Sequence, residues 1–152
     1  MSATPTHLQD LMQSIGPASP WIESLIQEDS DSWTLQSSEG LSIAIHFNHQ
    51  TMRVFLTALL GHPEQVHQLL IYTTMLSVNL LFAEDYSLRV ALTAPNGELM
   101  MISEAAPPVT MDELQHVILH FHQYATRLME EIHAITDSDT QPESINTDFL
   151  RA

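Results

Sequence analysis

The stretch DSWTLQSSEGLSIAIHFNHQTMRVFLTALLG, residues 31–61, decides the fold of this chain. Large apolar side chains occupy every second position of residues 41–47, with Ser42, Ala44 and His46 between them, a pattern typical of a strand with one buried face. Further strands are predicted over 33–36 and 52–59, and short polar turns separate the three. Because such short connections join neighbouring antiparallel strands, the stretch predicts a three-stranded meander.

Before this meander, the sequence predicts a first helix over residues 5–15. Its apolar positions follow the spacing of one helix face, and Gly16-Pro17 is expected to end it. Residues 17–32 leave two interpretations open, a second short helix or an irregular connector. The apolar face of the first helix consists of Leu8, Leu11, Met12 and Ile15.

After the meander, a central helix is predicted over residues 63–83, with two apolar stripes instead of one. An amphipathic helix on a monomer surface needs only one apolar stripe, so the second implies burial against something else. A second copy of the chain related by C2 symmetry is a plausible partner. One stripe is Val66, Leu69, Leu70, Thr73, Leu76 and Leu80; the other is Ile71, Met75, Val78 and Phe82.

A hairpin and a long helix complete the pattern. Strands are predicted over 86–94 and 98–103, joined at Asn96-Gly97, a strong signal for a type I′ turn. Thr110 to Glu113 forms a capping box, and one continuous apolar face then runs to Ile135. The chain is therefore predicted to be α+β, an antiparallel sheet with helices packed on it in the order α-β-β-β-α-β-β-α. A single domain is expected over residues 1–135, followed by a flexible acidic tail over 136–152.

The charge balance excludes several functions. The chain has 19 acidic residues, four arginines and no lysine, a formal net charge of −15. Nucleic-acid binding and adsorption to anionic membranes both need basic groups, so neither partner is expected. A phosphate-binding loop would want a lysine. The absence of cysteine suits a reducing cytosol, and we see no secretory signal or membrane span.

The residues offer little catalytic chemistry. His116 and His120 lie four apart on the last helix, so their rings could share a metal ion, but no third ligand or activating carboxylate accompanies them. No nucleophile elbow or glycine-rich phosphate loop is present. We therefore expect no catalytic, cofactor-binding or metal-binding residues and no cofactor, and keep a His116/His120 metalloenzyme as a distant alternative. Eight methionines are compatible with adaptable apolar surfaces as well as with core packing.

Four segments carry a resemblance to a known family. Residues 31–45 resemble its first two strands and their tight turn, and 55–61 resemble its third strand with a small-Leu-Gly ending. Residues 76–81, Leu-Ser-Val-Asn-Leu-Leu, resemble the Leu-x-x-Asn-Leu segment of its middle helix, and 111–114 resemble the start of its last helix. With the acidity, this order of elements resembles the class I type III secretion chaperones, the Tir-chaperone family. Residues 17–32 depart from it, being longer than the family's usual passage into the first strand.

The resemblance implies an acidic, cytoplasmic homodimer, without ATPase activity, in a bacterium with a type III secretion system. Such a protein binds the N-terminal chaperone-binding segment of one or more effectors and keeps it soluble, extended and ready for secretion. The secretion ATPase or export apparatus is a further possible partner. The alternative is a regulatory or adaptor protein of the same fold that binds a folded regulator or a secretion-apparatus component.

Two sets of residues are predicted to form the binding surfaces of such a protein, although each stripe could equally pack inward, because the sequence does not say which strand face is core. The predicted dimer interface consists of Ile71, Met75, Val78, Asn79, Phe82, Leu88 and Val90. The predicted effector-binding residues are Leu8, Leu11, Met12, Ile15, Leu35, Ile43 and Ile45.

Overall fold

The computed structural model describes residues 6–85 and 87–138, and their backbone forms one antiparallel sheet covered by helices. Neighbouring strands follow the order β1-β2-β3-β4-β6-β5, with every pair antiparallel. The elements are α1 (Thr6–Ala18), β1 (Ile22–Gln27), β2 (Ser32–Ser37), β3 (Ser42–Asn48), β4 (Arg53–Gly61), α2 (Gln68–Asp85), β5 (Leu88–Leu92), β6 (Leu99–Ala105) and α3 (Met111–Asp137). The predicted α+β class and the meander are confirmed.

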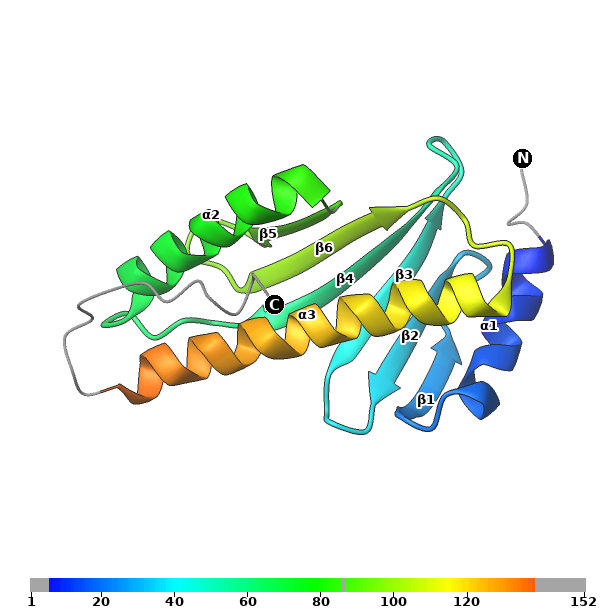
Figure 1. Cartoon of the computed structure of the whole chain (residues 1–152), viewed down its shortest axis with the longest axis horizontal. Coiled ribbons are helices and arrows are strands. Elements are labelled where there is room, and N and C mark those ends of the chain that lie inside the picture. The colour runs from blue at the N-terminus through cyan, green and yellow to red at the C-terminus, as the bar shows by residue number, and fades with distance from the viewer. Residues whose placement is uncertain (1–5, 86, 139–152) are drawn as a thin grey trace.

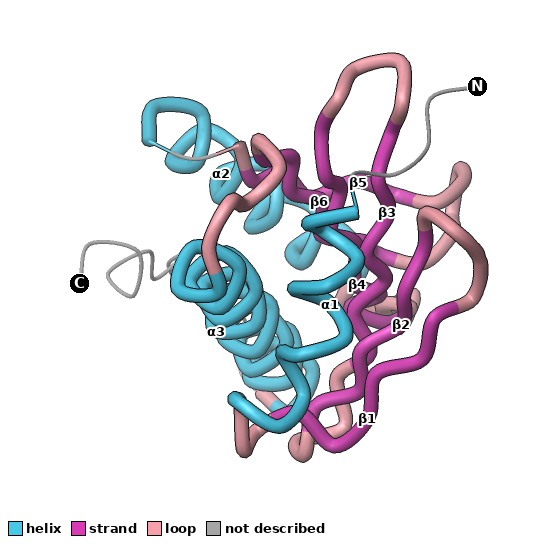
Figure 2. The backbone as a smooth tube through the Cα atoms, turned by 90° about the vertical axis from the view of Figure 1, so that its right-hand side faces the viewer, coloured by secondary structure: helices cyan, strands magenta, loops and turns pink. Residues whose placement is uncertain are grey.

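The molecule has two layers. Figure 2 shows the helices on one side and the strands on the other, and in Figure 1 the long helix α3 runs across the strands. The core lies between these layers, because the alternating apolar residues of β2, β3 and β4 all point toward the helices. Phe47 and Leu56 from the sheet and Phe121 from α3 are among the fully buried side chains.

The sheet contains a strand that the sequence pattern did not reveal. Residues 22–27 form β1, which pairs with β2 at the edge of the sheet, so the expected order lacked one strand. The pairing register shifts between Ile22 and Ser24, and such a bulge breaks the alternation of apolar side chains. Ile22 is buried and Leu25 half-buried, three positions apart, and this spacing imitates a helix.

Two helix boundaries were also predicted wrongly. Helix α1 continues through Gly16-Pro17 to Ala18, and the Ser19 N–H then donates to the Gly16 carbonyl oxygen at 3.2 Å. Helix α2 begins at Gln68, five residues after Pro63, because residues 65–67 form a turn first.

The β5–β6 hairpin does not use the expected type I′ turn. Asn96 has a φ of 59°, but Gly97 is not at positive φ, and a type I′ turn needs positive φ at both positions. Instead, Pro95 and Asn96 are the central residues, and the Gly97 N–H donates to the Ala94 carbonyl at 2.8 Å. Positive φ at the second central residue is the requirement of a type II turn, which proline at the first position favours.

The capping box of α3 is confirmed. The Glu113 N–H donates to Thr110 Oγ1 at 3.2 Å, and the Thr110 N–H donates to Glu113 Oε2 at 3.4 Å. The helix runs to Asp137, two residues beyond the predicted end of the domain. Three parts of the predicted elements lie outside the described residues: Pro5 of the first helix, Tyr86 of the fourth strand, and residues 139–152 of the acidic tail.

Candidate protein-interaction surfaces

Helix α2 presents one of its two apolar stripes to solvent. Val66, just before the helix, and Leu69, Leu76 and Leu80 on it have exposed fractions between 69% and 82%, the highest of any large apolar side chains among the described residues. Exposed apolar side chains aligned along one helix face are typical of a protein-interaction surface. We call Val66, Leu69, Leu76 and Leu80 the α2 stripe.

The other stripe of α2 faces the chain's own sheet, so most residues of the predicted dimer interface are buried within the protomer. These side chains are at most 7% exposed and belong to the core. Of these, only Met75 and Val90 also line an open hollow of the protomer surface, described below. The residues concerned are Ile71, Met75, Val78 and Phe82 on α2, and Leu88 and Val90 on β5.

The remaining predicted interface residue, Asn79, joins α2 to the edge strand β5. Its Nδ2 donates to the Val90 carbonyl at 2.9 Å, and the Val90 N–H donates to its Oδ1 at 2.6 Å. The side chain therefore takes both backbone groups of Val90, as a neighbouring strand would. Asn79 closes the β5 edge at this point, and added strands cannot pair there.

A hollow of about 300 Å³ lies between α2 and β5, next to the α2 stripe. Leu76 belongs both to the stripe and to the wall of the hollow, and Leu92, 37% exposed, lies at the edge strand. The stripe and the hollow therefore form one continuous apolar surface. The residues that line the hollow are Tyr72, Met75, Leu76, Asn79, Val90, Ala91, Leu92 and Leu99.

The predicted effector-binding residues are also mostly buried within the protomer. Leu11 is half-buried, and the other six are at most 1% exposed. These side chains belong to the core between the helices and the sheet, and of the six only Met12 also lines an open hollow. The buried six are Leu8, Met12, Ile15, Leu35, Ile43 and Ile45.

The accessible surface of this region is a hollow of about 460 Å³ between α1 and β1. Met12 and Gln13 of α1 form one wall, and Ile22 and Leu25 of β1 form another. Strand β1 is the last strand of the sheet on this side, and no described strand pairs with its outer edge. The unpaired backbone of an edge strand can accept an extended segment of another chain.

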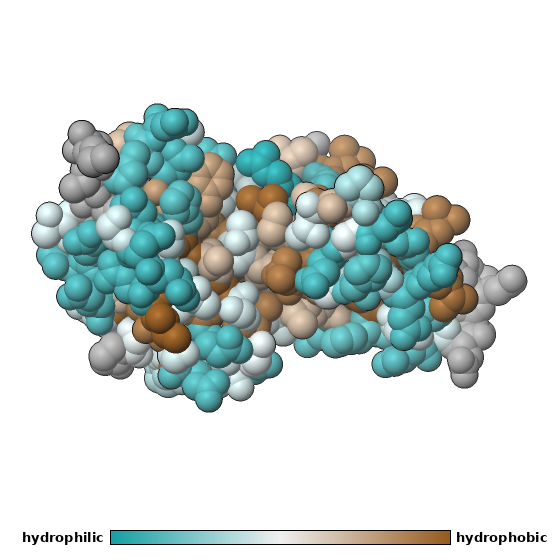
Figure 3. All heavy atoms as spheres, turned by 180° about the vertical axis from the view of Figure 1, so that it is seen from behind, coloured by the Kyte–Doolittle hydropathy of each residue, from teal (hydrophilic) through white to brown (hydrophobic). Residues whose placement is uncertain are grey.

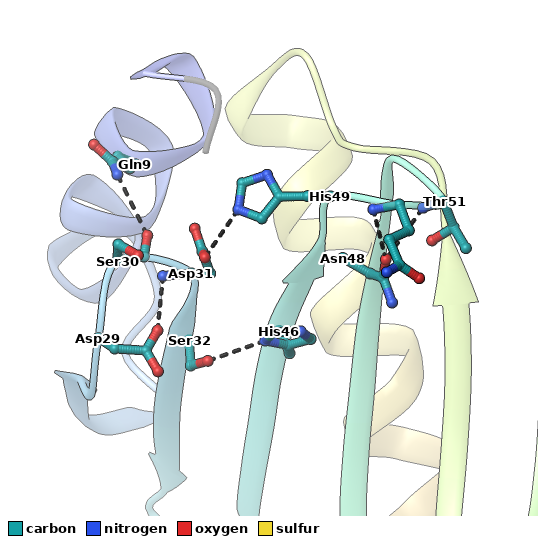
Figure 4. Close-up of polar contacts among 10 residues, drawn as sticks. Gln9, Asp29, Ser30, Asp31, Ser32, His46, Asn48, His49 and Thr51 are labelled. Carbon is teal, nitrogen blue, oxygen red and sulfur yellow. Dashed lines mark hydrogen bonds and ion pairs between the residues drawn. The ribbon is translucent and has the colours of Figure 1, made fainter. Parts of the chain in front are cut away.

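Polar contacts hold α1 beside this edge. The Asp31 N–H donates to Asp29 Oδ1 at 2.8 Å, and this hydrogen bond lowers the pKa of the Asp29 carboxyl. Three further contacts surround the loop between β1 and β2 (Figure 4). In the loop, the Ser30 carbonyl accepts from Gln9 of α1 at 3.4 Å, and Asp31 pairs with His49 at 2.8 Å. Ser32, the first residue of β2, bonds to His46 of β3 at 3.0 Å.

On the back of the molecule, hydrophilic residues are interspersed with hydrophobic ones (Figure 3). Glu104 forms ion pairs with Arg53 at 2.8 Å and with Arg89 at 3.4 Å, which link three neighbouring strands. Leu59 is half exposed on the same face. Two of the four arginines therefore form ion pairs with Glu104 on this face.

His116 and His120 do not form a recognisable metal centre. Their rings stack at a centroid distance of 5.8 Å, and the pKa of His120 is lowered, first by burial and then by His116. Across residues 6–85 and 87–138, no group of three or more His, Cys, Asp or Glu side chains could hold a metal ion. In the same part of the chain, no helix is both long enough and apolar enough to cross a bilayer.

The fold is that of class I type III secretion chaperones. The chain superimposes on the ExsC–ExsE complex with a TM-score of 0.64 and 13% identity, covering 86% of this chain and 96% of the other. For the HopA1–SchA chaperone–effector complex, the TM-score is 0.58 and the identity 15%, over 82% and 91% of the two chains. For the ExoU–SpcU complex of the type III secretion system of Pseudomonas aeruginosa, the TM-score is 0.53 and the identity 20%, over 70% of this chain and 86% of the other.

A further solved structure shares this fold. YbjN from E. coli, described as a putative transcription regulator, matches with a TM-score of 0.61 and 13% identity, over 88% of this chain and 96% of its own. No protein-family model matches the chain, and no curated protein matches its sequence. At these identities the similarity is one of fold, and function has to be argued from the surfaces.

Proposed function

We propose that this protein is a type III secretion chaperone that binds the N-terminal segment of one or more effectors and keeps it extended and soluble. The observation that carries the proposal is the open β1 edge beside the α1–β1 hollow, in a fold shared with proteins solved in chaperone–effector complexes. An edge strand supplies backbone hydrogen bonds, and the adjoining hollow receives side chains.

The physical basis is the burial of apolar side chains that an unfolded segment would expose. A client strand paired with β1 directs alternate side chains toward the α1–β1 hollow, where Met12 and Leu25 provide apolar contacts. That burial offsets the entropy that the client loses on becoming ordered. The net charge of −15 favours clients with basic residues and keeps the complex soluble.

The working form in this proposal is a homodimer held by the α2 stripe. A C2 interface places the same patch of both protomers together, which suits a straight stripe of four large apolar side chains. The apolar hollow beside Leu76 is then available to receive side chains of the partner protomer. Dimerisation removes from water the most exposed apolar side chains of the described chain.

The test is binding of an effector fragment, identified by co-purification from the native host and mass spectrometry. Gln13→Trp places a bulky ring in the α1–β1 hollow, and we expect it to weaken binding at least about tenfold, since a misfit in a buried contact costs more than ~1.4 kcal/mol. Ser14→Trp, on the same helix but outside the hollow, is the control. Equal affinities for the two variants would contradict the site.

The second candidate is a regulatory or adaptor protein that binds a folded partner. The similarity to YbjN favours it, because that protein of the same fold is described as a putative transcription regulator. Co-purification separates the two: an effector's N-terminal fragment as the main partner supports the chaperone, whereas a folded transcription factor or secretion-apparatus component supports the regulator.

A further inference from the structure

A third hollow, of about 460 Å³, lies beside α3. Its apolar walls are Trp21, from the connection between α1 and β1, and Leu119 of α3. Two carboxylates line it as well, Glu39 from the β2–β3 turn and Glu130 from α3. Segments far apart in the sequence therefore supply one apolar and acidic hollow.

His122, which lines this hollow, carries a polar atom without a partner. Its side chain is only 8% exposed, and its Nε2 makes no hydrogen bond. Glu39 Oε2 lies 3.7 Å from this nitrogen, too far for a hydrogen bond. The Trp21 ring packs against the imidazole with a centroid distance of 4.7 Å. A buried polar atom left unpaired in this way costs free energy that a ligand can recover.

Burial lowers the pKa of His122, and the coulombic effect of Glu39 only partly opposes this. Burial thus favours the neutral imidazole, whose Nε2 accepts a hydrogen bond when Nδ1 carries the proton. Both carboxylates and the indole ring favour a cation, and Arg127, which also lines the hollow, is outnumbered by Glu39 and Glu130. An anionic ligand would meet the two carboxylates and a chain of net charge −15.

We propose that this hollow binds an arginine side chain of a partner polypeptide. The guanidinium lies between Glu39 and Glu130 and rests its aliphatic stem on Trp21 and Leu119, and the His122 ring turns to bring its buried Nε2 to the donated N–H. Arginine suits the hollow better than lysine, because its planar group can stack on an aromatic ring and donate in several directions at once. The proposal rests on the proposed function in one respect, that the polypeptide is the client segment.

The test uses N-acetyl-arginine amide as the probe and the full-length protein, followed by NMR of the tryptophan indole and histidine ring signals. We expect saturable shifts at Trp21 and His122, and no shift at Trp33, which is buried in the core. N-acetyl-citrulline amide has nearly the same shape without the charge and should give no saturable shift. N-acetyl-glutamate amide tests the opposite charge and should also give none.

Matched variants separate the local carboxylates from the overall charge. Glu39→Gln and Glu130→Gln should each weaken arginine-amide binding about two- to fivefold, the range expected for an exposed ion pair. Glu64→Gln and Glu98→Gln remove the same charge from exposed positions outside the hollow and should leave the affinity unchanged.

Three results would each overturn the proposal: no saturable shift up to the solubility limit of the arginine amide, an equal response to citrulline amide, or a stronger response to glutamate amide. Because the probe contains no client, loss of client binding in the Gln13→Trp variant leaves this test intact. Conversely, failure of the arginine probe leaves the α1–β1 hollow as a client site.

Discussion

At the scale of single residues, Asn79 shows how one side chain can join a helix to the edge of a sheet. It exchanges two hydrogen bonds with the backbone of Val90, at 2.9 and 2.6 Å, and so acts as a short piece of neighbouring strand. Val90 belongs to β5, and its side chain is buried on the face of this strand that α2 covers. The polar edge of β5 is thereby satisfied beneath a mostly apolar helix.

Replacement of Asn79 by alanine removes both hydrogen bonds. We expect the free energy of unfolding to fall by about 2 kcal/mol, because the two backbone groups of Val90 lose their partner in a half-buried position. Urea unfolding followed by circular dichroism measures this change. Ser77→Ala, which removes only a hydrogen bond to the Thr73 carbonyl of the same helix, is the control and should cost less.

Two histidines of α3 make stability depend on pH. Burial lowers the pKa of His120 and of His122 below the ordinary value of 6.5. On acidification, the unfolded chain therefore binds protons at these positions before the folded chain does. The free energy of unfolding should fall as the pH drops through about 6.5, and this loss ends below the lowered pKa values of the folded state.

The measurement is urea unfolding at neutral pH and at about pH 5, where an ordinary histidine is protonated. His122→Gln should reduce the difference in unfolding free energy between the two pH values, since glutamine does not titrate. His133→Gln, at an exposed position of the same helix, is the control. The same pH dependence in wild type and both variants would contradict a role for His122.

At the scale of elements, α2 is the part of the molecule with two apolar faces. Its inner face, including Met75 and Val78, belongs to the core, and its outer face carries the α2 stripe. A helix that is apolar on all sides is normally buried on all sides. The described chain covers only the inner face, and this is why we assign the outer face to a second copy.

Charges placed on the two faces should have opposite consequences. Leu76→Glu and Leu80→Glu should leave the fold intact and convert a dimer to a monomer, since both side chains are exposed in the protomer. Met75→Glu should instead cost more than about 4 kcal/mol of stability, because it buries a charge in the core.

Analytical ultracentrifugation with circular dichroism distinguishes these outcomes. Val109→Glu changes an exposed apolar residue outside the stripe and should leave the sedimentation of the dimer unchanged. Folded dimers of both Leu76→Glu and Leu80→Glu would show that the stripe is not the interface.

At the scale of the whole molecule, charge and apolar surface are separated in an informative way. The chain carries a net charge of −15, yet α2 and the α1–β1 hollow present apolar side chains. Mutual repulsion between acidic chains opposes aggregation through these surfaces. In the proposed function, the same field would attract a basic client segment from a distance.

The association rate of a basic client segment should therefore depend on salt. We expect a decrease of about tenfold between ~0.01 M and ~0.15 M ionic strength, because the Debye length shrinks from ~30 to ~8 Å over that range. Stopped-flow fluorescence measures the association rate, and the dissociation rate should change much less. A rate independent of salt would contradict electrostatic steering.

The sequence by itself determined what depends on local pattern. Large apolar side chains at every second position of 41–47 predicted a strand with one buried face, and the capping box at Thr110 predicted the start of α3. Side-chain periodicity and hydrogen bonds between near neighbours suffice for such features. Strand β1 escaped prediction because its bulge interrupts the period of two that identifies a strand.

Only the tertiary structure decided which apolar face points inward. The sequence shows two apolar stripes on α2 and an apolar face on α1. Residues that pack on the sheet and residues that contact a partner are both apolar, so the sequence does not distinguish them. Packing resolved the choice by burying Ile71 and Met12 and leaving Leu76 exposed. The hollow around His122 likewise joins a connector, a turn and a helix that lie far apart in sequence. Burial is set by contacts between distant segments, so no local pattern can specify it.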